Sequence, residues 1–377
     1  MTAAVPEVLL LDGVLDAEQA ADTVRSILAE QQPDGAIPWY SGHHLDPWDH
    51  TEAAMALDTA GEHTAAEAAY RWLAARQNPD GSWYAAYAYG QGGGADGAEG
   101  AGGAGGAERG FADGEVCNAA KETNFCAYIA VGVWHHHLST GDDAFLEWIW
   151  PTVRRALDFI VARRLPGGPI AWRLDEHGEA ADEALLTGSS SILHALRCGL
   201  AVADYLEEPQ PDWELAAGRL RHAITHHPER FLDKDRYSMD WYYPVLGTAL
   251  RGAAAVERIE RDWDRFVVPG LGVRCVSDRP WVTGGESAEL AMALWAVGES
   301  DRAVDILRWI QKHLRHTDGS YWTGYVFEDD AIWPEERTTW TAGALLLTVA
   351  ALGGDPATVA VFGGDHLPAG LVVQDCC

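Results

Sequence analysis

Segment 39–50 holds the densest group of polar and aromatic side chains in the chain. Three His, two Asp and two Trp fall within these twelve residues, immediately before an apolar helix. Indole faces stack on pyranose rings, while Asp and His side chains bind hydroxyl groups or transfer protons. The segment therefore predicts a sugar subsite. Its expected catalytic residues are Asp46 and Asp49, and its expected substrate-binding residues are Trp39, His43, His44, Trp48 and His50.

Two other interpretations of this segment stay open. Asp46 or Asp49 can instead cap a helix that begins near Thr51, with Trp48 packed against the wall. A metal site built on the two adjacent His is less favoured, because neighbouring His side chains rarely reach one ion without a further ligand elsewhere. The six Cys match no zinc spacing, so we expect neither a metal nor a cofactor.

Two further carboxylates are catalytic candidates. Glu286 follows two Gly that permit close approach of the backbone, and Glu336 lies beside Arg337 at the predicted start of the last apolar helix. A helix N-terminus favours an ionised acid, so Glu336 is a candidate base for activating water. The structural alternative for either Glu is ordinary stabilisation of a first helical turn, worth roughly 0.3–1 kcal/mol.

Carboxylate, amide and aromatic side chains recur near the starts of the other apolar helices. Glycoside hydrolysis needs two carboxylates, held roughly 6.5–9.5 Å apart in inverting enzymes. A ring of helices with these starts around one mouth can supply such a pair from two hairpins. The remaining predicted substrate-binding residues are Glu122, Asn124, Asp240, Trp241, Trp281, Trp322, Trp333, Arg337 and Trp340.

Six stretches share one form, a loop with Trp, Gly or acidic residues followed by a run of small and apolar residues: 46–57, 121–130, 182–191, 240–249, 280–289 and 334–343. Amphipathic helices are predicted between them at 15–31, 64–77, 142–164, 212–232, 256–266 and 300–314. A helix that is apolar all round, such as 342–352, is buried on all sides. The alternation predicts an all-α fold, an (α/α)6 toroid of six helical hairpins. Strands have little support beyond a short pair near 267–276.

The domain organisation follows from this pattern. One toroid domain is expected over residues 1–353, followed by a C-terminal tail at 354–377. Residues 90–110 consist almost entirely of Gly, Ala, Asp and Glu. Such a composition cannot bury enough apolar area to become ordered, so a flexible insertion is predicted there.

Charge and hydropathy limit the classes of partner that this protein can bind. There are 57 acidic and 27 basic residues, for a net charge of −30. Nucleic acid and anionic membranes would be repelled over most of the surface. The N-terminus does not have the pattern of a signal peptide, and no stretch approaches the roughly 18 apolar residues of a membrane span. We therefore expect a cytoplasmic protein without stable membrane insertion.

A second repeat places a Gln before an Asp-Gly turn and an aromatic residue. It is complete in 72–83 and partial in 27–37. This Gln…Gly-x-Trp pattern resembles the repeats of the terpenoid cyclase and protein prenyltransferase toroids. The six hairpins are also similar to those of the six-hairpin glycosidases and sugar epimerases. Segment 333–342 is similar to the glucoamylase-type segment in which a catalytic Glu precedes an inner helix.

Departures from the isoprenoid enzymes favour the carbohydrate resemblance. The chain has no Asp-x-Asp-Asp motif, no Asp, Cys and His zinc set and no basic diphosphate cluster. The leading hypothesis is a carbohydrate-active enzyme, either a glycoside hydrolase or an epimerase, with an oligosaccharide or small-molecule substrate. His43, His44 or His50 would carry protons in an epimerase. The alternatives are a prenyltransferase- or cyclase-like enzyme acting on an isoprenoid and a non-catalytic binding toroid.

Overall fold

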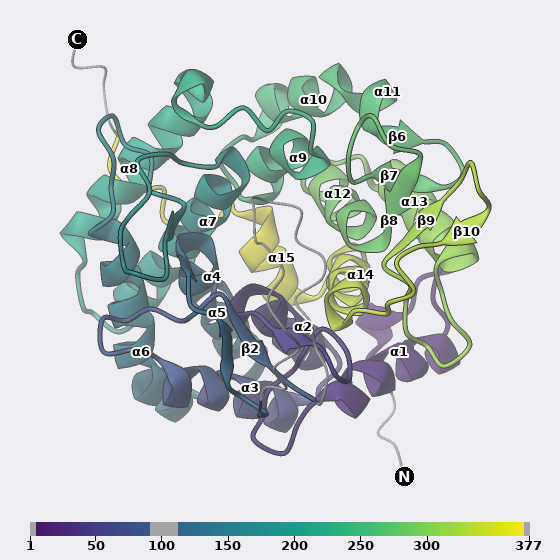
Figure 1. The fold of residues 1–377 in the computed structure, drawn as a ribbon, viewed down its shortest axis with the longest axis horizontal. Helices are drawn as coiled ribbons and strands as arrows, with labels where there is room; N and C mark the ends of the chain where they lie inside the picture. Colours follow the sequence, from purple (N-terminus) through teal and green to yellow (C-terminus); the bar gives the residue numbers. More distant parts are fainter. Residues whose placement is uncertain (1–4, 91–111, 373–377) are drawn as a thin grey trace.

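The computed structural model describes residues 5–90 and 112–372. The predicted insertion at 90–110 therefore lies outside the described residues except for Gly90, and so does the Cys376-Cys377 end. Within the described part, two concentric rings of helices surround a common axis (Figure 1). The prediction of an all-α toroid of six hairpins is confirmed.

The outer ring is formed by α1 (Ala17–Glu30), α3 (His63–Arg76), α6 (Asp143–Val161), α8 (Pro211–His226), α10 (Gly252–Arg261) with α11 (Trp263–Phe266), and α13 (Ser300–His313). The inner ring is formed by α2 (Pro47–Thr59), α4 (Thr123–Ala127) with α5 (Ile129–Thr140), α7 (Leu186–Tyr205), α9 (Ser238–Leu246), α12 (Gly284–Ala296) and α14 (Thr339–Leu352). The inner helices all run in the same direction along the axis of the rings, so their N-terminal ends surround one mouth.

The helices of the two rings differ in which residues are buried, as the hydrophobic pattern predicts. In the outer helix α13, burial is confined to Ala303, Ile306, Leu307 and Ile310, which repeat every three or four residues along one face. The inner helix α14 is buried along its whole length except at Trp340 and Leu352. A helix in the inner ring contacts neighbours on every side, so it needs an apolar or small residue at nearly every position.

The Gln–Gly repeat joins consecutive outer helices. Gln77 Nε2 donates to the carbonyl of Gly81 (3.0 Å) in its own turn and to the carbonyl of Thr152 (2.9 Å) in α6. Gly81 has φ +91°, and a Cβ there would lie 2.2 Å from the carbonyl oxygen of Arg155. The Gln thus binds its own turn, as the repeat predicts, and also the next helix of the ring.

The same arrangement recurs at Gln31 and Gly35, where the Gln donates to Ala65 of α3. At the seam of the ring, the turn after α13 packs against α1. A Cβ at Gly319 would lie 2.4 Å from the backbone carbon of Asp22. Close backbone contact between neighbouring turns therefore closes the circle.

Strands are more numerous than the sequence predicted. A five-stranded antiparallel sheet has the order β10-β9-β8-β7-β6, and smaller sheets are formed by β1-β2-β3 and β4-β5. The expected pair near 267–276 is β6–β7, and the prediction missed the others because two or three residues cannot show an alternating pattern. The bounds are β1 (His44–Leu45), β2 (Ala86–Ala88), β3 (Val116–Asn118), β4 (Lys121–Glu122), β5 (Arg173–Leu174), β6 (Val267–Val268), β7 (Gly272–Arg274), β8 (Trp281–Thr283), β9 (Gly324–Val326) and β10 (Ala331–Ile332).

The end of the toroid opposite the mouth is covered by α15 (Pro356–Gly363), which belongs to the segment expected as a tail and packs against α5 and α14. His135 Nε2 lies 3.0 Å from the hydroxyl of Thr358, which joins α5 to α15. No single described helix is long and apolar enough to cross a membrane, and α14 with α15 meets that test only as a pair bent by 100°.

Candidate active site

Asp46 is the N-cap of α2 and lies at the mouth. Its Oδ1 accepts from the backbone N–H groups of Trp48 (2.9 Å) and Asp49 (3.0 Å), and its Oδ2 accepts from the indole N–H of Trp39 (2.6 Å). The side chain is almost completely buried. Burial raises the pKa of Asp46, while these hydrogen bonds oppose the rise. Asp46 is thus both the helix cap that the structural alternative predicted and a member of the mouth.

Asp49 lies one turn further along α2, and its pKa is strongly perturbed. Burial raises its pKa well above the usual range, and the negative charges of Asp46, Glu52 and Glu289 raise it further. Its side chain also hydrogen-bonds with that of Asp46. The hydrogen bond between the two side chains raises the pKa of Asp49 and lowers that of Asp46, which also accepts three N–H groups. These contacts favour a proton on Asp49 over one on Asp46.

Two more carboxylates face this pair from deeper in the barrel. Glu52 follows Asp49 by three residues on α2, and Glu289 projects from α12. Burial raises the pKa of both, that of Glu289 to about 8. Glu289 accepts hydrogen bonds from the hydroxyl groups of Tyr242 and, at 3.2 Å, Tyr243. These contacts hold Glu289 in place at the floor of the mouth.

Glu286 lies in the first turn of α12, where the free backbone N–H groups favour a negative charge. It is 6% exposed, and its Oε2 has no hydrogen-bond partner in the part of the chain that the structure describes. Burial and the neighbouring Glu286 carboxylate, which accepts a hydrogen bond from the thiol, raise the pKa of Cys275. An unsatisfied carboxylate oxygen at the mouth is suited to bind a hydroxyl group or a water molecule.

Glu122 is the last residue of strand β4, directly before α4. Burial and the charge of Asp46 raise its pKa to about 7, and Arg173 on the paired strand β5 opposes the rise. Asn124 follows in the first turn of α4 and is 5% exposed. A Cβ at Gly188 of α7 would lie 3.6 Å from the Asn124 amide, so Asn124 lies between two inner helices.

Aromatic rings form the walls between these acids. Trp48 lies 5.8 Å from Phe125, 5.6 Å from Tyr128 and 5.5 Å from Tyr243, measured between ring centroids. Trp340 packs on Gly285, where a Cβ would come within 2.5 Å of the indole, and it hydrogen-bonds to Glu289. The mouth therefore combines acids with aromatic walls, as expected for a sugar site.

The His residues of segment 39–50 do not have the environment of proton carriers. His50 is fully buried; its Nδ1 accepts from the backbone N–H of Ile37 (3.0 Å), and its Nε2 lies 3.0 Å from the carbonyl of Ala69. Burial lowers the pKa of His44 and of His50 to about 4. His43 and His44 pack on Trp39, with centroids 5.5 and 4.4 Å away. The substrate-binding role predicted for His50 is thus replaced by a structural one.

Two residues predicted from the fourth hairpin also have structural contacts. Trp241 is 3% exposed, stacks on Phe266 (5.3 Å) and donates its indole N–H to the carbonyl of Arg258 (2.9 Å). Asp240 accepts the hydroxyl of Thr187 (2.5 Å), which ties α9 to α7. Trp241 is therefore a packing residue. Asp240 lies at the mouth, where its carboxylate is hydrogen-bonded to Thr187.

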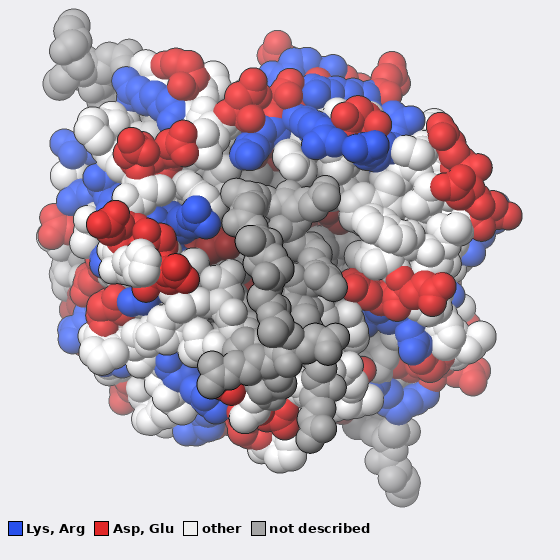
Figure 2. Space-filling view, in the orientation of Figure 1, with Lys and Arg blue, Asp and Glu red and all other residues white. Residues whose placement is uncertain are grey.

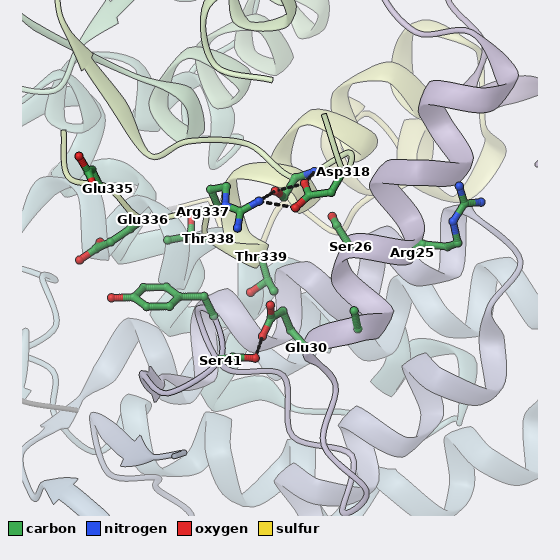
Figure 3. A pocket seen from close by; sticks show the side chains of 13 residues that line it. Arg25, Ser26, Glu30, Ser41, Asp318, Glu335, Glu336, Arg337, Thr338 and Thr339 are labelled. Atoms are coloured by element: carbon green, nitrogen blue, oxygen red, sulfur yellow. Dashed lines mark hydrogen bonds and ion pairs between the residues drawn. The ribbon is translucent and has the colours of Figure 1, made fainter. Parts of the chain in front are cut away.

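Glu336 and Arg337 line a separate rim pocket of about 360 Å3 between α1 and the loop before α14 (Figure 3). Arg337 points toward Asp318 and pairs with it, while Glu336 points the other way. Glu336 hydrogen-bonds to Tyr40, whose pKa is raised by burial and by this carboxylate.

The helix-dipole argument for Glu336 was wrong. α14 begins at Thr339 with Thr338 as its N-cap, so Glu336 precedes the first turn in which the dipole acts. Arg337 forms its ion pair with Asp318 and lies 5.1 Å above Trp322, so this pair braces the turn after α13. The Asp46, Asp49 and Glu289 group is built without these residues.

Trp281 and Trp333 lie on the five-stranded sheet at the rim. Their ring centroids are 5.0 Å apart with an interplanar angle of 70°, and Trp333 is 56% exposed. Trp281 is half-buried beneath this exposed ring, while Trp48 and Trp340 line the mouth. The described residues contain no group of three or more His, Cys, Asp or Glu arranged to hold a metal ion.

Sequence reasoning missed several members of the acidic group. Glu52, Glu289, Tyr242, Tyr243 and Tyr128 surround the floor, and none of them was a predicted site residue. A signal was present for the two Glu. Each is a charged residue on an inner helix expected to be buried, where a charge is costly unless it is paired or hydrogen-bonded.

The raised pKa of Glu289 predicts a pH-dependent stability. The folded protein keeps this proton up to about pH 8, whereas the unfolded chain releases it near the ordinary pKa of 4.5. The folded state binds more protons in that window, so its free energy of unfolding falls as pH rises. Chemical denaturation across this window is expected to show the fall, with a smaller slope in Glu289→Gln. Exposed Glu335→Gln is the control, and an unchanged slope in Glu289→Gln would contradict the assignment.

No protein-family model matches the chain. Among characterised proteins, the MMP endo-(1,4)-3-O-methyl-α-D-mannosidase of Mycolicibacterium hassiacum is 50% identical over 365 residues, which cover 97% of this chain and 94% of the relative. This similarity extends over both rings and the mouth.

Solved structures share the fold at low identity. A glycosidase variant in complex with glucose has a TM-score of 0.65 at 17% identity, covering 89% of this chain and 96% of the other. A D-mannose isomerase has a TM-score of 0.62 at 10% identity over 89% and 97%. A sugar epimerase from a ruminal bacterium has a TM-score of 0.56 at 12% identity over 90% and 99%. The resemblance to six-hairpin glycosidases is thereby confirmed for the fold, and the terpenoid resemblance stays a prediction.

Proposed function

We propose that this chain, which belongs to the family of the MMP endo-(1,4)-3-O-methyl-α-D-mannosidase and is a carbohydrate-active enzyme, hydrolyses internal bonds of a 3-O-methylmannose oligosaccharide. The observation that carries the proposal is the buried Asp49 held against Asp46 at the mouth, where burial and the neighbouring carboxylates raise its pKa. A binding-only role needs no buried acid with a raised pKa, and the 50% identity to an endo-mannosidase favours a sugar over an isoprenoid substrate.

Asp49 is the proposed general acid. Glycosidic bond cleavage requires a proton on the leaving oxygen, and an acid with a raised pKa keeps that proton at neutral pH. The burial and the negative neighbours that raise the pKa of Asp49 are therefore suited to this role. Asp46 positions Asp49 and stays ionised through its three N–H donors. After the proton has been transferred to the leaving sugar, the carboxylate of Asp49 takes up a new proton from solvent.

Glu286 is the proposed base. It would take a proton from a water molecule, whose oxygen forms the new bond to the anomeric carbon while the leaving sugar takes the Asp49 proton. The free Oε2 of Glu286 can accept that water. α2 and α12 both pack against α14, so Asp49 and Glu286 come from two different hairpins, and the proposal places the attacking water between their carboxylates. We therefore propose inversion of the anomeric configuration.

A digestion experiment tests the function. Purified protein is incubated with an α-(1,4)-linked 3-O-methylmannose oligosaccharide, and products are followed by mass spectrometry and proton NMR. Internal cleavage is expected, with the new anomeric signal of inverted configuration appearing first. Release of single terminal sugars would contradict the endo mode, and first appearance of the retained anomer would contradict the role of Glu286. An unmethylated α-(1,4)-linked mannose oligosaccharide and maltooligosaccharides serve as comparison substrates.

A further inference from the structure

The Trp281–Trp333 pair is a rigid aromatic corner. Trp281 donates its indole N–H to the carbonyl of Trp333 (2.8 Å), and the backbone N–H of Trp333 donates to Gly324 (3.0 Å). Trp281 lies directly on Gly324, where a Cβ would come within 2.2 Å of its indole nitrogen. The Trp281 ring and the Trp333 backbone are thus fixed before any ligand arrives, and the Trp333 ring stands edge-on to Trp281, which lowers the entropic cost of binding.

The corner is continuous with the acidic mouth. Trp281 lies at the start of β8, and β8 runs directly into α12, which carries Glu286 in its first turn. Three strand residues at about 3.3 Å each place the corner roughly 10 Å from the start of α12. Strand pairing of Trp281 with Val326 of β9 fixes this direction.

The surface around the corner differs from the rest of the mouth. Figure 2 shows a largely uncharged area over β8, β9 and β10, with acidic side chains at its borders. In a chain of net charge −30, such an area favours an uncharged ligand with apolar groups over an ionic one. An oligosaccharide with O-methyl groups has this character, because hydroxyl groups alternate with methyl groups along it.

Other exposed aromatic side chains have different surroundings. Trp148 is 46% exposed on the outer helix α6, with the guanidinium of Arg71 4.4 Å above its ring. Tyr205 is 50% exposed and donates its hydroxyl to Asp143 (2.7 Å). Both lie on elements remote from the mouth, so they provide controls for exposure alone.

We infer that Trp333 and Trp281 form a remote subsite that binds the methylated sugar chain beyond the cleavage point and favours methylated over unmethylated units. This inference rests on the proposed function for the identity of the chain. One O-methyl group buried on an indole face favours binding by about fourfold. Loss of the Trp333 ring is expected to weaken binding of a long methylated chain by about tenfold.

Calorimetric titration tests the subsite without relying on turnover. The probes are short and long α-(1,4)-linked oligosaccharides of 3-O-methylmannose and their unmethylated counterparts. Trp333→Ala is expected to raise the Kd for the long methylated chain about tenfold, to leave the short chain unchanged and to reduce the methyl preference. Trp333→Phe is expected to restore part of the affinity, and Trp148→Ala is expected to match the wild type in every titration.

The outcomes separate the two proposals. Equal Kd values for the long methylated chain in wild type and Trp333→Ala would overturn the subsite, whatever the enzyme cleaves. An equal rise for short and long chains would also overturn it, because it would indicate a change at the mouth. Binding that depends on Trp333 without cleavage of any methylated chain would support the subsite and overturn the proposed hydrolysis.

Discussion

Replacement of Asp49 by Asn is expected to lower kcat on the methylated oligosaccharide by about 100- to 10,000-fold, with little change in the Kd for substrate. General acid catalysis contributes about this factor. Asn keeps the size of the side chain and can still donate to Asp46, but it has no proton to transfer to the leaving oxygen. Steady-state kinetics with titration of the inactive variant measures the two quantities separately.

Two comparisons sharpen this prediction. Glu336→Gln changes a carboxylate in the rim pocket that the acidic pair does not use, and we expect most of the activity to remain. The rate is also expected to fall as pH rises through the pKa of the Asp49 acid, because only the protonated form donates. A large loss in Glu336→Gln together with full activity in Asp49→Asn would reverse the assignment and return the glucoamylase-type base to Glu336.

Replacement of Gly81 by Ala is expected to destabilise the fold by about 3–5 kcal/mol, among the largest effects of a single methyl group. Two causes act together. Gly81 has φ +91°, which Ala adopts only with strain, and the added Cβ would lie 2.2 Å from the carbonyl oxygen of Arg155. Chemical denaturation followed by circular dichroism measures the loss.

Gly141→Ala is the matched control for this experiment. Gly141 also has positive φ, +66°, at the end of α5, but nothing lies within 4 Å of the position of its Cβ. Only the conformational cost remains, about 1–2 kcal/mol. Equal losses for both variants would show that the contact between the turn and α6 does not hold the outer ring together.

Hydrophobic periodicity was sufficient to predict the rings. Outer helices such as α13 alternate buried and exposed faces, while inner helices such as α14 are apolar throughout, and both patterns are local properties of the chain. The pattern also placed Asp46 and Asp49 at the start of an inner helix. Short strands such as β8 have no such signature, since three residues cannot show an alternating pattern and one of its partners, β9, lies about 40 residues further along the chain.

The chemistry of the site depends on contacts between hairpins, which no local pattern encodes. The raised pKa of Asp49 results from burial together with the charges of Asp46, Glu52 and Glu289, the last of which is 240 residues away along the chain. Glu336 and Asp49 are both carboxylates near inner-helix starts, so the local sequence pattern does not distinguish them. One is buried beside other acids and the other lies in a rim pocket, because desolvation and charge repulsion depend on distance in space rather than along the sequence.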